Sequence, residues 1–142
     1  MPYPEYLIAP MRQELTELGA RECRTAEDVD AVVKSSGVVM MVVNSVCGCA
    51  AAKARPGIGL ALNHAAKPDV VATVFAGADM AATDRARQYF APFPPSSPSV
   101  ALLRDGKLLY MLERRDIESR SAEMIADQLT LAFDKHCAPV AK

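Results

Sequence analysis

The sequence predicts an α/β fold in which a mixed four-stranded sheet is flanked by helices and preceded by two extra helices. Two observations carry this prediction. Residues 38–44 and 70–75 are apolar without alternation, which is typical of strands buried on both faces, and a helical pattern follows each run. Further along, two short apolar segments flank Asp105 and Gly106, a dipeptide typical of a tight hairpin turn. A parallel βαβ unit followed by an antiparallel hairpin is therefore expected.

Two helices are expected ahead of the first strand. Pro10 is placed to open one of them, because proline suits the first turn of a helix, and Gly19 is placed to end it. The preceding segment, residues 4–9, is interpreted as a short helical turn. The hydroxyl of Thr25 can cap the backbone amides of the second helix, which Gly37 closes.

Each of the two apolar strands is followed by a helix with its own signals. Residues 50–66 are rich in alanine and predict a helix that starts at about Cys49, but Pro56 and Gly57 interrupt it, so a kink is expected there. Asp79 precedes the next helical pattern and is expected to cap that helix with its carboxylate.

The remaining elements complete the sheet and cover it. Residues 99–104 and 107–112 form the expected hairpin, and residues 121–137 have an amphipathic helical pattern. The βαβ unit requires a right-handed parallel crossover, and the hairpin adds two antiparallel strands to the same sheet. This succession is the core of a thioredoxin-like fold, and residues 1–142 are expected to form a single domain.

Composition and charge narrow the classes of protein. The 142 residues are 51% hydrophobic and 23% charged, which is ordinary for a globular protein. The net charge is -1 and no basic cluster exceeds the pair Arg114 and Arg115, so nucleic acid is not an expected partner. The N-terminus lacks a signal-peptide pattern and no run approaches the roughly 18 apolar residues of a membrane span, so a cytoplasmic protein without a membrane partner is expected. The cytosol keeps structural thiols reduced, so a close cysteine pair there indicates redox or metal chemistry.

The candidate active site is the CGC turn, in which Cys47 and Cys49 flank Gly48 directly after the first strand. A thiol between the end of a parallel strand and the start of a helix lies at the usual ligand-binding edge of the sheet. Free helix amides there lower a cysteine pKa from about 8.5 toward roughly 3.5 to 7.5. The helix dipole alone is too weak, so direct amide hydrogen bonds are expected, with Lys53 or Arg55 as further contributors. Cys47 is assigned as the nucleophile and Cys49 as the resolving thiol, although the roles could be exchanged.

The one-residue spacing constrains a bond between the two thiols. In a regular strand the Cα atoms at i and i+2 lie about 6.6 Å apart, and in a helix the two side chains point almost oppositely. A disulfide therefore needs an irregular turn, and Gly48 is the residue most able to make one because it is free to take a positive φ. The small ring is expected to be strained and easily reduced, which suits isomerisation or release of a thiol from a mixed disulfide.

A second part of the expected site lies in the loop before the hairpin. Pro98 immediately precedes the first hairpin strand, where a cis Ser97-Pro98 bond would bend the chain toward the CGC turn. Ser97 and Pro98 are therefore candidate substrate-binding residues, together with Gly48.

Metal binding and a purely structural cysteine pair are the alternatives for the CGC turn. Tetrahedral zinc requires four ligands, and the only other close pair, His136 and Cys137, consists of helix neighbours that point apart. No metal or cofactor is therefore expected in this chain alone, although a dimer could complete a site on a metal-carrying or assembly scaffold. Cys137 and Cys23 are interpreted as buried residues that pack as small apolar groups.

Five stretches of the chain together carry a resemblance to a known family: NSVCGCAAAKARPG, PMRQEL, ATVFAG, PPSSPSVALLRDGK and AFDKHC. Over nearly its whole length the chain resembles the bacilliredoxins, a bacterial thiol-disulfide isomerase family. The resemblance implies a thioredoxin-like thiol-disulfide oxidoreductase that removes a low-molecular-weight thiol, bacillithiol, from mixed disulfides on cytosolic proteins. Its partners would be those thiol-modified client proteins and the small thiol, and a protein disulfide isomerase is the alternative activity. By position, Cys47 corresponds to the attacking cysteine, Cys49 to the second motif cysteine and Pro98 to the proline facing them.

Overall fold

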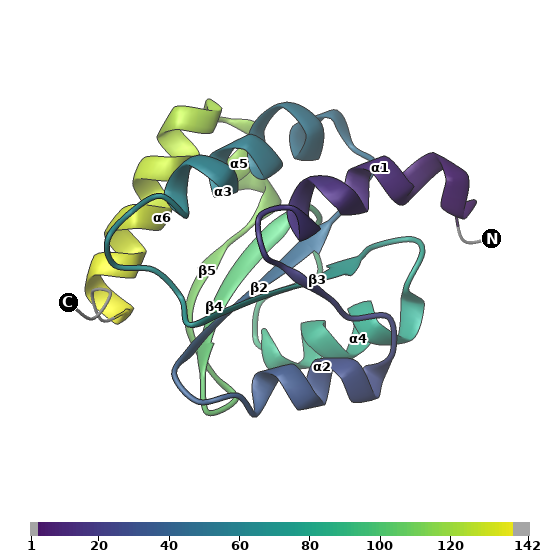
Figure 1. The fold of residues 1–142 in the computed structure, drawn as a ribbon, viewed down its shortest axis with the longest axis horizontal. Helices are drawn as coiled ribbons and strands as arrows, with labels where there is room; N and C mark the ends of the chain where they lie inside the picture. Colours follow the sequence, from purple (N-terminus) through teal and green to yellow (C-terminus); the bar gives the residue numbers. More distant parts are fainter. Residues whose placement is uncertain (1–2, 138–142) are drawn as a thin grey trace.

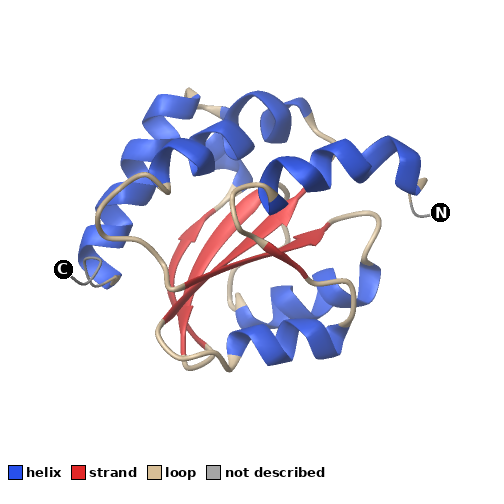
Figure 2. Ribbon diagram, in the orientation of Figure 1, coloured by secondary structure: helices blue, strands red, loops and turns tan. Residues whose placement is uncertain are grey.

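The computed structural model describes residues 3–137, in which a twisted five-stranded sheet separates two layers of helices (Figure 1, Figure 2). The strand order is β1-β3-β2-β4-β5. β3 pairs in parallel with both β1 and β2, whereas β4 is antiparallel to both β2 and β5. In chain order the elements are α1 (Glu5–Thr16), β1 (Arg21–Glu22), α2 (Ala26–Val33), β2 (Val38–Asn44), the π-helix η1 (Ala50–Ala54), α3 (Arg55–Ala61), β3 (Val70–Phe75), α4 (Met80–Tyr89), β4 (Ser99–Arg104), β5 (Lys107–Leu112), α5 (Arg114–Glu118) and α6 (Ala122–His136).

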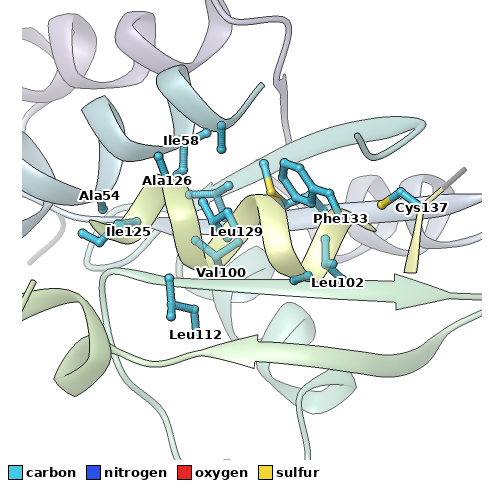
Figure 3. Packing of buried hydrophobic residues seen from close by; sticks show 14 of the residues in the cluster. Ala54, Ile58, Val100, Leu102, Leu112, Ile125, Ala126, Leu129, Phe133 and Cys137 are labelled. Atoms are coloured by element: carbon cyan, nitrogen blue, oxygen red, sulfur yellow. The ribbon is translucent and has the colours of Figure 1, made fainter. Parts of the chain in front are cut away.

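The central strand β2 is buried on both faces, as its unbroken apolar sequence predicts. All seven of its residues are buried. Val38, Met40 and Val42 belong to the cluster that packs under α3 and α6 (Figure 3). The alternate residues of β2 belong to a second cluster on the other face, which α2 and α4 cover. Because successive side chains of a strand point to opposite faces, one apolar run serves both halves of the core.

The sheet has one more strand than the sequence predicts. Arg21 and Glu22 form the two-residue strand β1, which pairs in parallel with β3 at the edge of the sheet. A segment of two charged residues has no hydrophobic periodicity, so sequence patterning does not detect it. The expected four strands β2 to β5 are all present.

The first helix also begins earlier than predicted. α1 starts at Glu5 and contains Pro10 in its interior, so Pro10 does not open the helix. A proline at this point removes one backbone hydrogen bond to the residue four positions earlier. That residue is Tyr6, which is 84% exposed and lies where water can replace the missing donor.

The helix after the CGC turn is irregular at a different place from the predicted kink. The π-helix η1 comes first, and the Arg55 amide bonds back to the Ala50 carbonyl. Pro56 then lies in the first turn of α3, which ends at Ala61 and not at residue 66. Gly57 serves close packing, because a Cβ there would lie 2.7 Å from Cγ2 of Ile125 on α6.

Two local predictions hold and one is wrong. The Thr25 hydroxyl accepts a hydrogen bond from the Asp28 amide, which caps α2 as expected. Asp105 and Gly106 both have positive φ and form the hairpin turn. The Asp79 side chain, in contrast, does not cap α4, because it accepts hydrogen bonds from Arg12 at 2.7 and 2.9 Å.

Among residues 3–137, none of the helices has both the length and the apolar character needed to cross a membrane.

Candidate active site

Cys47 lies at the junction between β2 and the following helix, where the sequence predicts it. β2 ends at Asn44, the chain bends through residues 45–47, and helical backbone begins at Gly48. The amide of Ala50 donates to the Cys47 carbonyl at 2.9 Å, which closes the first turn. The Cys47 thiol is half-buried and therefore retains access from solvent.

The backbone around Cys47 directs donors to its sulfur. The amide of Cys49 donates a hydrogen bond to Cys47 Sγ at 3.2 Å. The Cys47 amide in turn donates to Oγ of Ser45 at 3.3 Å, which fixes the bend ahead of the thiol. A sulfur that accepts amide hydrogen bonds at the start of a helix is better stabilised as a thiolate than as a thiol.

The pKa values of the two thiols in the turn are shifted in opposite directions. Partial burial raises the pKa of Cys47, whereas hydrogen bonds from the Cys49 amide and thiol lower it. The Arg114 guanidinium and the Ala50 amide lower it further. Together these groups outweigh burial, so the pKa of Cys47 lies below its ordinary value. The pKa of Cys49 is raised, mainly because its thiol donates to Cys47 and also because of burial and the Cys47 charge. One thiol is thus prepared to ionise first.

Arg114 is the charged residue that helps to lower the pKa of Cys47, and the sequence did not predict this role. Lys53 donates to the Glu118 carbonyl. Arg55 is buried, where it contacts Glu14 and Asn44 at 2.9 Å. Neither fulfils the expectation that it acts on the thiolate. The only sequence signal for Arg114 is its place in the short basic pair that follows the hairpin.

Arg55 supports the turn from inside the protein. Its guanidinium donates to Oδ1 of Asn44 and to the Ser45 carbonyl at 3.1 Å, and the same Asn44 oxygen accepts from the Ser45 amide. Because a buried guanidinium holds several acceptors in a fixed geometry, this network anchors the chain just before Cys47.

Gly48 does not adopt the expected positive φ. It has helical backbone, and the positive-φ residues among those described lie elsewhere. A Cβ at Gly48 would meet nothing within 4 Å. Both Cys47 and Cys49 are free thiols in this state, and the irregular backbone near them is the bend before Cys47 and the π-turn η1 after Cys49.

A cavity of about 360 Å³ opens beside Cys47. Its lining brings together the turn after β2, the segment after β3, α4 and the start of α5, and includes Tyr3, Cys47, Gly77, Arg87, Ser97 and Arg114. The Ser97-Pro98 bond is cis. Ser97 therefore shares the cavity with Cys47, whereas Pro98 is buried and, like Gly48 and Cys49, is not part of the lining.

Within the described part of the chain, residues 3–137, no three or more His, Cys, Asp or Glu side chains are grouped so that they could hold one metal ion. The CGC pair would need ligands from a second molecule to complete a tetrahedral site.

Sequence relatives extend over nearly the whole chain. The family model described as disulphide isomerase matches residues 3–137. A bacilliredoxin of Koribacter versatilis is 56% identical over 140 residues, covering 98% of this chain and 97% of the relative. A bacilliredoxin of Cytophaga hutchinsonii is 50% identical over 133 residues, covering 94% and 98%. One of Geobacillus kaustophilus is 46% identical over 140 residues, covering 97% of each.

Solved structures agree with the fold. A thioredoxin from Malassezia sympodialis superimposes with a TM-score of 0.54 at 15% identity, covering 82% of this chain and 90% of that structure. The protein Trxlp from Edwardsiella tarda gives a TM-score of 0.53 at 17% identity, covering 78% and 99%. The predicted thioredoxin-like fold is confirmed. The chain therefore belongs to the disulphide isomerase family, whose similar curated members are bacilliredoxins, and it is a thiol-disulfide oxidoreductase.

Proposed function

We propose that this cytoplasmic protein removes a low-molecular-weight thiol, bacillithiol, from mixed disulfides on client proteins, with Cys47 as the nucleophile and Cys49 as the resolving thiol. The observation that carries the proposal is that the pKa values of the two thiols are shifted in opposite directions. Cys47 has a lowered pKa and lines a cavity, whereas the pKa of Cys49 is raised. Cys47 is therefore the thiol that ionises more readily, and Cys49 is the one that more readily keeps its proton.

In the first step, the Cys47 thiolate attacks the sulfur of the small thiol within the mixed disulfide. The bond to the client breaks, the client sulfur leaves as a thiolate that takes a proton from solvent, and a disulfide forms between Cys47 and the small thiol. The Cys49 amide donates to the Cys47 sulfur, the charge of Arg114 favours the thiolate, and Cys47 lines the cavity together with Ser97. Of the proposed substrate-binding residues, Ser97 lines this cavity, whereas Gly48 and Pro98 adjoin Cys47 and Ser97 along the chain.

In the second step, Cys49 loses its proton and attacks Cys47 Sγ, which releases the small thiol and forms the Cys47-Cys49 disulfide. A second small thiol can instead attack the mixed disulfide, which frees Cys47 and yields the oxidised small-thiol dimer. Each route exchanges one disulfide for another, so the two electrons that reduce the client come from Cys47 and Cys49 or from two small thiols.

The test separates the two cysteines. A client protein carrying bacillithiol is mixed with reduced wild type, Cys49→Ser or Cys47→Ser, and the protein masses are measured. Cys49→Ser should accumulate one bacillithiol on Cys47 while the client becomes reduced, and Cys47→Ser should leave the client modified. A Cys47→Ser variant that is fully active, with the small thiol trapped on Cys49, would reverse the assignment.

Disulfide isomerisation is the second candidate, and the description of the matching family favours it. An isomerase needs the Cys47 thiolate to attack a protein disulfide, after which another client thiol displaces it. Cys49→Ser should then retain activity on a scrambled disulfide protein. A glutathione-modified client run beside the bacillithiol-modified one shows which small thiol the cavity accepts.

A further inference from the structure

Two arginines line the cavity next to Cys47 and give it positive charge. Arg87 comes from α4 and Arg114 from the start of α5, and both line the same space of about 360 Å³. No carboxylate is among the lining residues of the cavity. A space of this size suits a small molecule, and its two guanidinium groups favour one that is an anion.

Arg87 lacks the ion pair that comparable arginines have. The partly or fully buried arginines Arg12, Arg55 and Arg85 each have a carboxylate at 2.7 to 2.9 Å. Among residues 3–137, no carboxylate forms a salt bridge with Arg87, whose hydrogen bond to the Ser96 carbonyl is long at 3.5 Å. Its Nε is shielded from solvent and has no hydrogen-bond partner in the described chain.

The lack of a partner is unfavourable for the Arg87 guanidinium, and a bound anion would relieve it. A buried donor without a partner loses its hydration and gains nothing in return, and the loss is larger for a charged group. Of the buried side-chain nitrogen and oxygen atoms in the described residues, Arg87 Nε is the one left in this condition. The Arg87 guanidinium also lines the cavity, and no carboxylate of residues 3–137 pairs with it, so an anion bound in the cavity would balance its charge.

Arg114 is held at the rim of the same cavity. Its Nε donates to Glu118 at 3.2 Å and its Nη1 donates to the Ser97 carbonyl at 3.3 Å. These two contacts join the guanidinium to α5 and to the loop that contains Ser97, so they keep it beside that loop. Its side chain remains 46% exposed, which leaves donors available to a ligand.

We propose that Arg87 and Arg114 form a subsite for carboxylate groups, so that the protein selects low-molecular-weight thiols that carry negative charge. The inference rests on the proposed function, because it places the sulfur of that thiol on Cys47 and the rest of the molecule in the cavity. Arginine matches a carboxylate with two parallel N–H donors, which gives the contact both strength and direction.

Two small probes test this subsite without a client protein. One is the 2-pyridyl disulfide of mercaptosuccinate, which carries two carboxylates, and the other is the 2-pyridyl disulfide of mercaptoethanol, which carries none. Attack by the Cys47 thiolate on the probe's aliphatic sulfur forms the mixed disulfide with Cys47 and releases 2-thiopyridone, whose absorbance gives the rate. Each rate is divided by that of the same probe with free cysteine, which removes its intrinsic reactivity.

Wild type should prefer the carboxylate probe by about tenfold or more, as expected for a charged hydrogen bond formed in the cavity. Arg87→Gln should slow the carboxylate probe much more than the neutral probe and so remove this preference, and Arg87→Lys should restore part of it. Arg115→Gln is the matched control, because Arg115 is exposed and is not part of the cavity lining. Arg114→Gln is less diagnostic, since that guanidinium also acts on Cys47 and its loss slows both probes.

Equal rates with the two probes in wild type, or an equal loss with both probes in Arg87→Gln, would overturn the subsite. A preference for an acidic peptide disulfide without one for mercaptosuccinate would also overturn it, in favour of a client-binding role for the arginines. Failure of the proposed function looks different, because Cys47 would then react with neither probe faster than an exposed thiol.

Discussion

The four cysteines occupy two contrasting environments. Cys47 and Cys49 lie at the edge of the sheet, where backbone amides and Arg114 face the first thiol. Cys23 and Cys137 are buried on opposite faces, one in the cluster covered by α2 and α4 and the other in the cluster under α3 and α6 (Figure 3). A cysteine side chain is therefore half-exposed and able to ionise at the edge of the sheet, whereas in the core it packs as a small apolar group.

Their acidities differ accordingly. Burial raises the pKa of Cys23 to about 11, with the Asp28 charge as a smaller contribution. Burial likewise raises the pKa of Cys137 to about 11, and Asp69 adds to it. The pKa of Cys47 moves the other way because hydrogen bonds to its sulfur outweigh its partial burial. The contrast teaches that hydrogen-bond donors and access to water, more than the presence of a thiol, distinguish a reactive cysteine in this fold.

The largest expected effect is in the rate of alkylation. At pH 7, a pKa of about 11 leaves only about one thiol in 10⁴ ionised, whereas an ordinary pKa of about 8.5 already leaves roughly 3%. Cys47 should therefore react with iodoacetamide more than about 100-fold faster than Cys23 or Cys137, and burial widens the gap. Mass spectrometry of peptides from protein quenched at successive times gives the four rates.

The unfolded protein is the control for this experiment. In denaturant all four cysteines should label at similar rates, because the structural causes of the shifts are gone. Labelling of native Cys23 or Cys137 as fast as Cys47 would contradict the contrast between the two environments.

Glycines show the same difference between open and packed positions. A Cβ at Gly48 would meet nothing within 4 Å, whereas one at Gly57 would lie 2.7 Å from Cγ2 of Ile125 and 3.1 Å from the Ala122 carbonyl. Gly57→Ala should therefore push α3 from α6 and lower the free energy of unfolding by about 1 to 3 kcal/mol. Gly48→Ala should be neutral or slightly stabilising, because alanine favours helical backbone. Urea denaturation of the two variants measures both effects, and equal losses would disprove the packing role of Gly57.

The sequence predicts the parts of the fold whose signals are local. β2 and β3 follow from apolar runs, the hairpin follows from Asp105-Gly106, and the place of Cys47 follows from the end of one strand. β1 escapes detection because its pairing with β3 depends on the tertiary structure and not on its two residues.

The charged partner of Cys47 could not be predicted for a similar reason. The sequence predicts Arg55 on the exposed face of the helix that follows the turn. A π-turn inserts a residue before Arg55 and rotates later side chains by about 100° relative to a continuous α-helix. Arg55 points inward to Asn44 and Glu14. Arg114 reaches the site from a residue 67 positions after Cys47, through packing of α5 beside η1 that no local pattern encodes.

The smallest expected effect concerns the pH dependence of stability. Because the pKa values of Cys23 and Cys137 are raised to about 11, above pH 8.5 the unfolded chain binds fewer protons at these positions than the folded protein does. The contribution of each buried thiol to the free energy of unfolding is therefore fully present below that pH. By pH 10 each contribution should have fallen by about 1 to 2 kcal/mol. Cys47 has the opposite sign, since its lowered pKa favours the fold as pH rises toward its unfolded value.

Single variants show how much each region contributes to the change of the free energy of unfolding with pH. Cys23→Ala and Cys137→Ala should each be somewhat less stable at pH 7, because a small apolar group is lost from the core, but their free energy of unfolding should fall less steeply between pH 8 and 10. Cys47→Ser should make the fall steeper, because it removes the one thiol whose ionisation favours the folded state. Urea denaturation at several pH values measures the slopes, and a slope unchanged by either alanine substitution would mean that the buried thiols ionise as readily in the folded protein as in the unfolded chain.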